Sequence, residues 1–289
     1  MTVTAAGRKN ARKVRNKSFT VPQIILNLVI LAMLAIMLYP LIMCFWNAFK
    51  SDLDFMYTKW YPTIPLRFRN FVAAWPEVWR YVFNTLVVAV VGTAGMLFIS
   101  SLSAYTFARM RFPGKDFLYM VVIALMMIPG ILTLVPSYML YHGFGLLNTR
   151  LALIIPVAVG GSVFGVFLLR SFFAGIPEDV FEAARIDGAK EFKIYTSICL
   201  PLSMPILGTL TIMQINNIWN DYMWPMITQQ RDENLTISAG LLVRFVKEYT
   251  NNYPVQFAGY LISSIPLILL FVFANKYYIQ GLTSSAIKL

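Results

Sequence analysis

Long apolar runs alternate with short polar segments along this 289-residue chain. Each run is close to the roughly 20 residues that an α-helix needs to cross the hydrocarbon core of a bilayer. The pattern therefore predicts an all-α integral membrane protein with six transmembrane helices. They are expected at residues 21–46, 81–107, 117–139, 151–171, 202–224 and 257–275.

The first 20 residues are polar and carry six basic side chains with no acid among them. We interpret residues 1–20 as a basic cytoplasmic tail and residues 21–289 as a single transmembrane domain. The run after the tail is longer than the apolar region of a signal peptide and lacks a clear small-residue cleavage site, so we expect it to remain as the first span. Six crossings place both termini in the cytoplasm. Most of the 24 Lys and Arg residues then fall on the inner side, as membrane proteins prefer.

Composition supports a membrane location and argues against two other classes. With 58% hydrophobic and only 13% charged residues, the chain has too little polar surface to cover a soluble globule of this size. The net charge of +11 is explained by membrane orientation, so we do not expect nucleic acid binding. The two cysteines, Cys44 and Cys199, are too few for a disulfide framework or a metal site.

Two segments are expected on the outer side. Residues 48–80 are rich in aromatic side chains, which suits a loop at the membrane interface. Residues 226–256 are polar at both ends, and their middle, residues 237–246, is expected to form a short helix. Both segments are long enough to touch a soluble partner, or they pack over the ends of the spans.

The spans lack the groups that active transport or catalysis needs. No Asp, Glu, Lys, Arg or His lies deep inside a predicted span, and the nearest, Asp221, is close to the outer end of the fifth. This weakens the alternative of a stand-alone secondary transporter or channel. There is no HExxH or GxSxG motif and no phosphate-binding loop, since Gly114-Lys115 is followed by Asp116. A membrane-embedded enzyme is therefore disfavoured, and ATP-driven transport would need ATP and Mg²⁺ on another chain.

One polar interruption, residues 173–201, separates the fourth and fifth predicted spans. Pro177 suits the first position of a helix, and the acids that follow complement the helix dipole. Gly188 is a suitable C-terminal cap, so the segment predicts a short helix at 177–187 and a second at 189–199. An amphipathic hairpin on lipid headgroups is the alternative, but acids outnumber bases in this loop, which is unfavourable at an anionic cytoplasmic leaflet.

The spacing of Glu182-Ala183-Ala184, Gly188, Ile198 and Leu200-Pro201 resembles the EAA loop of membrane permeases of bacterial ABC importers. The whole chain, with its length, six spans and closing residues 281–288, is similar to the second, shorter permease of the maltose type of carbohydrate importer. Ser285 and the terminal Leu289 differ from the small, glycine-containing ending of that subfamily.

This resemblance implies a type I ABC importer permease in the bacterial cytoplasmic membrane. The expected partners are a second homologous permease, two ATPase subunits and an extracytoplasmic solute-binding protein. In such a loop Glu182 and Arg185 would pair with the ATPase, Ala183 and Ala184 would permit close approach, and Gly188 would permit the turn. The coupling set is completed by Asp187, Ile198, Leu200 and Pro201. No cofactor or metal is expected in this chain itself.

Polar and aromatic residues near the outer end of the fifth span suggest a substrate path. The candidates are Gln214, Asn217, Asn220, Asp221 and Trp224, with Asn84 of the second span as a weaker one. Amides beside an aromatic face suit sugar hydroxyls, but intramembrane amides also commonly hydrogen-bond neighbouring helices, and both interpretations remain open. The substrate stays open among maltodextrins, other plant oligosaccharides, uronate polymers and glycerol phosphate compounds.

Overall fold

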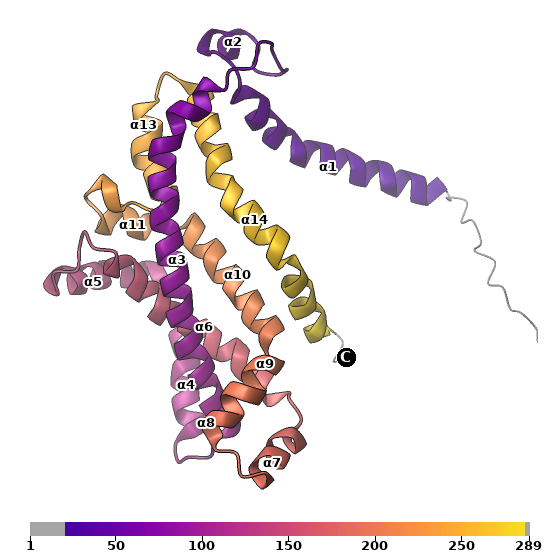
Figure 1. Cartoon of the computed structure of the whole chain (residues 1–289), viewed down its shortest axis with the longest axis vertical. Coiled ribbons are helices and arrows are strands. Elements are labelled where there is room, and N and C mark those ends of the chain that lie inside the picture. Colours follow the sequence, from indigo (N-terminus) through magenta and orange to yellow (C-terminus); the bar gives the residue numbers. More distant parts are fainter. Residues whose placement is uncertain (1–20, 287–289) are drawn as a thin grey trace, which may run out of the picture. The chain divides into compact units, whose positions relative to one another are not determined.

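The computed structural model describes residues 21–286, and the side chains of residues 21–274. The described residues are helical, with no β-strand among them (Figure 1). The predicted basic tail, Ser285 as a side chain and Leu289 lie outside this described part. The chain divides into two units after Met43, and helix α1, Val21–Asn47, reaches this boundary. By length and composition α1 is a candidate membrane span, as expected for the first apolar run.

The second unit contains the remaining helices. In chain order they are α2 Asp52–Tyr57, α3 Arg69–Arg109, α4 Lys115–Leu125, α5 Gly130–Gly143, α6 Leu151–Ala174, α7 Glu178–Ile186, α8 Glu191–Ile194, η1 Tyr195–Cys199, α9 Leu200–Leu202, α10 Met204–Asn220, α11 Met223–Thr228, η2 Asp232–Asn234, α12 Ile237–Gly240, η3 Leu241–Phe245, α13 Val246–Glu248 and α14 Tyr253–Ala286. Segments η1 and η3 are π-helical turns and η2 is a 3₁₀ turn. The outer helix expected at residues 237–246 is present as α12, η3 and α13.

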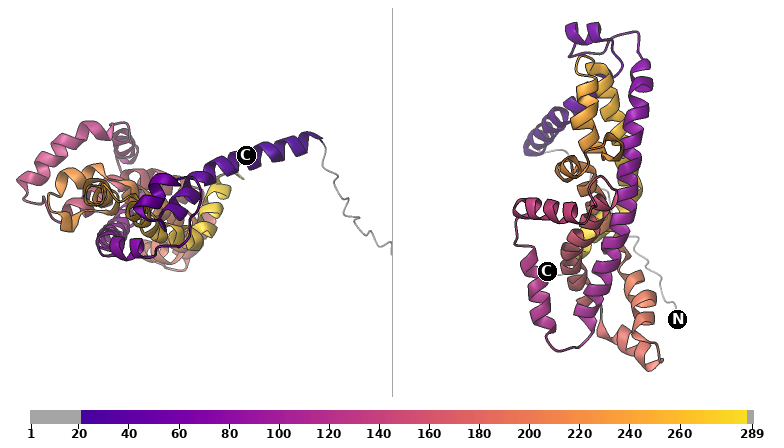
Figure 2. Two further views of the ribbon diagram at one scale, coloured as in Figure 1. Left: turned by 90° about the horizontal axis from the view of Figure 1, so that it is seen from above. Right: turned by 90° about the vertical axis from the view of Figure 1, so that its left-hand side faces the viewer.

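Four helices in the described residues are long and apolar enough to cross a membrane, and six spans result if each of two bent pairs is one span. Helices α4 and α5 meet at 94°, and α8–α9 meets α10 at 74°. The predicted third and fifth spans therefore each lie in a bent pair of helices, and the sequence analysis did not anticipate these bends. The right-hand view of Figure 2 shows the bend of the first pair. Pro129 stands immediately before α5 and lacks the N–H that a continuous helix requires. In the second pair, α9 ends at Leu202, and Pro205 lies at the start of α10.

The second span was predicted too short. Helix α3 runs for 41 residues and begins at Arg69, so much of the expected interfacial loop is helical. The reason is an amphipathic pattern, since Ala74, Val78 and Tyr81 are fully buried at helical spacing. The intervening Trp75 and Trp79 are about half exposed, and their rings stack with centroids 5.3 Å apart.

Helices α3 and α6 form the central packing of the second unit. Small residues let their backbones approach, because a Cβ built on Gly165 would lie 2.7 Å from the Cβ of Ser100. Helix α7 lies at the opposite end of α3 from α2 and α13 (Figure 1). The polar loop and the outer segments thus lie at opposite ends of this unit.

Candidate functional site

Helix α7 has the sharp C-terminal turn that its sequence predicts. Gly188 has a φ of +78°, in the left-handed region where glycine avoids the steric cost of a Cβ. The N–H of Gly188 donates to the carbonyl of Arg185, and the N–H of Ala189 donates to the carbonyl of Ala184. This pair of bonds is a Schellman motif, which satisfies carbonyls at the end of the helix. Asp187 is the C-cap, the last residue before the turn. Pro177 was expected as the first residue of the helix, but it is the N-cap, and α7 begins at Glu178.

Arg109, at the end of α3, fastens α7 to the membrane helices. Its side chain is only 6% exposed, and its guanidinium donates to the Glu178 carboxylate and to the carbonyl oxygens of Phe173 and Ile176. The same guanidinium lies 4.1 Å from the ring centroid of the fully buried Phe181. One cation thus holds the end of α6, the linker and the start of α7 together.

A second ion-pair relay joins α7 to α8. Arg185 donates to Glu178 and to Glu191, both at 2.9 Å. Glu191 also accepts a 2.6 Å hydrogen bond from the Tyr105 hydroxyl of α3. The hydrogen bond from Arg185, together with nearby Arg109, holds the pKa of the Glu178 carboxyl below its usual value, so Glu178 is ionised at neutral pH. The loop is therefore clamped to α3 at both of its helices.

The predicted coupling residues divide into inward and outward groups. Ala184 is buried, and Ile198 and Leu200 are partly buried in the core around α3, α6 and α10. Glu182, Ala183, Asp187, Gly188 and Pro201 are exposed. Ala184 therefore faces its own core and not the outward surface, because Phe181 and Ala184 share the helix face that packs on α3 and α6. Arg185, which is predicted to pair with the ATPase together with Glu182, is paired within the chain with Glu178 and Glu191.

Two large apolar side chains of this loop are exposed. Ile186 is 86% exposed and Phe192 is 70% exposed. Phe192 points outward, whereas the nearby Tyr195 is buried, and its hydroxyl lies 2.8 Å from that of Ser101. The loop therefore combines a rigid base with an apolar outward surface. Sequence reasoning missed Arg109, Tyr105 and Ser101, because contacts between distant segments leave no local signal.

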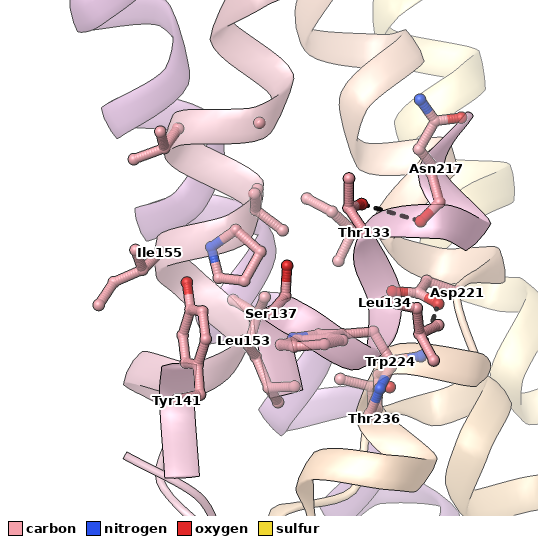
Figure 3. A pocket seen from close by; sticks show the side chains of 18 of the residues that line it. Thr133, Leu134, Ser137, Tyr141, Leu153, Ile155, Asn217, Asp221, Trp224 and Thr236 are labelled. Atoms are coloured by element: carbon pink, nitrogen blue, oxygen red, sulfur yellow. Dashed lines mark hydrogen bonds between the residues drawn. The ribbon is translucent and has the colours of Figure 1, made fainter. Parts of the chain in front are cut away.

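A cavity of about 760 Å³ opens between α5, α6, α10 and α11 (Figure 3). Four predicted path residues line it, namely Gln214, Asn217, Asp221 and Trp224, together with Thr133, Ser137 and Tyr141. This volume lies within the ~300–1,000 Å³ typical of small-molecule sites. Helix α5 thus contributes polar groups that the sequence analysis did not single out, and they follow the bend at Pro129.

The other two predicted path residues lie elsewhere. Asn84 is buried, donates to the carbonyls of Glu233 and Leu235, and accepts from Arg150, so it fastens the outer loop to α3. Asn220 bonds to Asn216 within its own helix. The cavity lining includes neither Asn84 nor Asn220.

Comparison with known proteins decides the family. Residues 95–284 match the family described as binding-protein-dependent transport system inner membrane component. The chain belongs to this family. It is therefore a permease component of an ABC importer and an inner membrane protein, as the EAA-like spacing predicted. The match covers the loop, the bent helices α4–α5 and the cavity.

Relatives of this permease cover most of its length. The probable ABC transporter permease protein YurM of Bacillus subtilis is 35% identical over 86% of this chain and 83% of its own. The arabinooligosaccharides transport system permease protein AraQ of Halalkalibacterium halodurans is 30% identical over 88% and 92%. The melibiose/raffinose/stachyose import permease protein MelC of Bacillus subtilis is 31% identical over 80% and 84%.

The permease also shares its fold with a solved chain. A chain in the crystal structure of a bacterial ABC transporter involved in the import of alginate superposes with a TM-score of 0.78. The alignment covers 88% of this permease and 95% of that chain at 24% identity. This likeness establishes the type I importer permease fold.

Proposed function

We propose that this permease is one half of the membrane channel of an importer for oligosaccharides or related polyols. The family match carries the proposal, and the relatives named for arabinooligosaccharides and for melibiose, raffinose and stachyose support the substrate class. The chain forms the channel with a second homologous permease and receives its substrate from an extracytoplasmic solute-binding protein. Six spans place both termini in the cytoplasm.

The energy comes from two ATPase subunits, which hold the ATP and Mg²⁺, so the permease itself is not an enzyme and carries no cofactor. The segment 173–201 transmits ATPase closure to the membrane helices. Three features support this role, namely the clamp of Arg109 on α7, the charged outward Glu182 and the exposed Ile186. An exposed apolar side chain beside charge on a rigid base is typical of a surface that a protein partner covers.

The test is reconstitution of this permease with a homologous permease, an ATPase and a solute-binding protein from the same organism. We expect a stable complex whose ATP hydrolysis rises with the loaded binding protein and which accumulates a neutral oligosaccharide in vesicles only when ATP is supplied. Vesicles with the binding protein omitted are the control. ATP-independent uptake by this chain alone would contradict the proposal and favour a stand-alone transporter.

A further inference from the structure

Four polar side chains around the cavity have no partner in the protein. Among the described residues, nothing hydrogen-bonds the side chains of Ser137, Tyr141, Gln214 or Asn217, although all four line the same space. The sequence analysis left open whether the fifth-span amides join neighbouring helices. Gln214 and Asn217 make no such bonds, so a packing role does not account for them. Unpaired donors and acceptors in a mainly apolar cavity suit a ligand that supplies hydroxyl groups.

An aromatic ring is fixed at the same cavity. The Trp224 indole N–H donates to the carbonyl of Ala152 at 2.8 Å, and the Tyr141 ring meets it edge-on at 5.4 Å between centroids. Its polar atom is thereby satisfied, and its orientation is set before any ligand arrives (Figure 3). A flat, preorganised apolar surface beside free hydroxyls and amides matches the two kinds of face that a sugar ring presents.

The charged residues that line the cavity distinguish neutral from anionic sugars. Asp221 carries the one ionisable acid, and no Lys, Arg or His occurs among the described residues that line the cavity. A ligand anion would meet a carboxylate in an apolar setting with no cation to pair it, and such like-charge contacts oppose binding. The two uronate and glycerol phosphate classes left open by the sequence are therefore unsuited to this cavity.

We propose that the α5–α10–α11 cavity is a substrate subsite of this permease that accepts neutral, hydroxyl-rich saccharides and rejects anionic ones. This rests on the proposed importer function and deepens it, because it assigns substrate contact to this subunit and a charge class to the substrate. The Asn217 amide and the Trp224 ring contact the sugar, and Asp221 sets the charge preference.

The test measures saccharide binding to the importer complex in nanodiscs. The solute-binding protein is omitted, so that the measured affinity is that of the membrane site alone. The probes are radiolabelled maltotriose, raffinose and arabinotriose, with trigalacturonate as the anion. We expect a neutral trisaccharide to bind about tenfold or more tightly than trigalacturonate, because the anion meets Asp221. Asp221→Asn should narrow this ratio.

A matched pair of variants on α10 tests the contact itself. Asn217→Leu should weaken neutral binding about fivefold, as expected for one lost hydrogen bond, whereas Asn220→Leu, which lies outside the cavity, should leave it unchanged. Both side chains are exposed, so neither change disturbs the core.

Three results would overturn the subsite. The first is an equal effect of Asn217→Leu and Asn220→Leu on the binding of neutral probes. The second is that trigalacturonate binds as tightly as the neutral probes. The third is that no probe binds to the complex, although the same complex still imports a saccharide when the binding protein is added. The last would leave the importer function standing. Failure of that complete importer to move any saccharide would instead contradict the proposed function, and the subsite with it.

Discussion

At the scale of single residues, Arg109 of α3 fastens the loop 173–201 to the membrane helices. Its buried guanidinium satisfies two backbone carbonyls, pairs Glu178 and covers the Phe181 ring. A lysine at this position has one compact ammonium and lacks the planar fork that reaches several acceptors at once. The residue therefore acts as a mechanical joint between α3 and α7.

We predict that Arg109→Ala loosens α7 and lowers uptake per ATP hydrolysed. Losing the donor leaves the part-buried carbonyl of Ile176 without this hydrogen bond, at about 1–3 kcal/mol for an unsatisfied group, and removes one of the two donors to the carbonyl of Phe173. Faster hydrogen exchange in residues 178–187, together with the ratio of uptake to hydrolysis, measures the effect. Arg111→Ala is the control, because Arg111 is exposed. Identical exchange in both variants would show that Arg109 does not hold the loop.

The sequence could not assign this role. Arg109 follows an apolar run and was interpreted only as one of the charges that orient the chain. Its partners come 64 to 69 residues later, and nothing in the local pattern marks them. Gly188, by contrast, was predicted correctly, because a helix cap is determined by neighbouring residues.

At the scale of elements, the turn between α7 and α8 sets the geometry of the loop. The Schellman bonds at Gly188 direct the chain so that Glu191 returns to Arg185 and Tyr105. A Cβ at Gly188 would meet no atom within 4 Å, so the constraint there is backbone conformation alone.

We predict that Gly188→Val separates α7 from α8, whereas Gly188→Asn retains most function. A β-branched residue is a strong outlier at φ +78°, at a cost of about 1–2 kcal/mol or more, while Asn tolerates the left-handed region. Both variants should insert in the membrane, and their ATP-driven uptake should differ. Equal uptake by the Val and Asn variants would mean that the turn is not required.

The elements that sequence analysis placed incorrectly share a physical cause. Hydropathy gives the apolar length of a span but not its path, so the bends before α5 and α10 were missed, although Pro129 and Pro205 mark them. The early start of α3 was missed because its first turns are amphipathic, with buried Ala74 and Val78 beside exposed tryptophans. Periodicity was the signal to use there.

At the scale of the whole second unit, one continuous stretch links the loop to the cavity. Helices α8, η1 and α9 follow the turn at Gly188, and α10 then carries Gln214 and Asn217 to the cavity wall. If a bound partner displaced α7, this stretch would move with it, because Arg109 and Glu191 hold α7 and α8 to α3. The proposed docking surface and the polar cavity thus lie on one continuous stretch of the chain.

The most direct test of this coupling is site-specific cross-linking in the assembled importer. The chain would carry Ile186→Cys in a Cys44→Ser background, with Cys199 retained because it is fully buried. The matched control is Trp60→Cys, an exposed position three residues after the end of α2. Helix α2 lies at the opposite end of α3 from α7 (Figure 1). The reagent is a maleimide that carries a photoactivatable group, which reacts with the introduced thiol and then with any nearby residue of a partner. We predict that Ile186→Cys cross-links to the ATPase and that Trp60→Cys does not. An ATP-hydrolysing complex in which Ile186→Cys gives no cross-link to the ATPase would contradict the account.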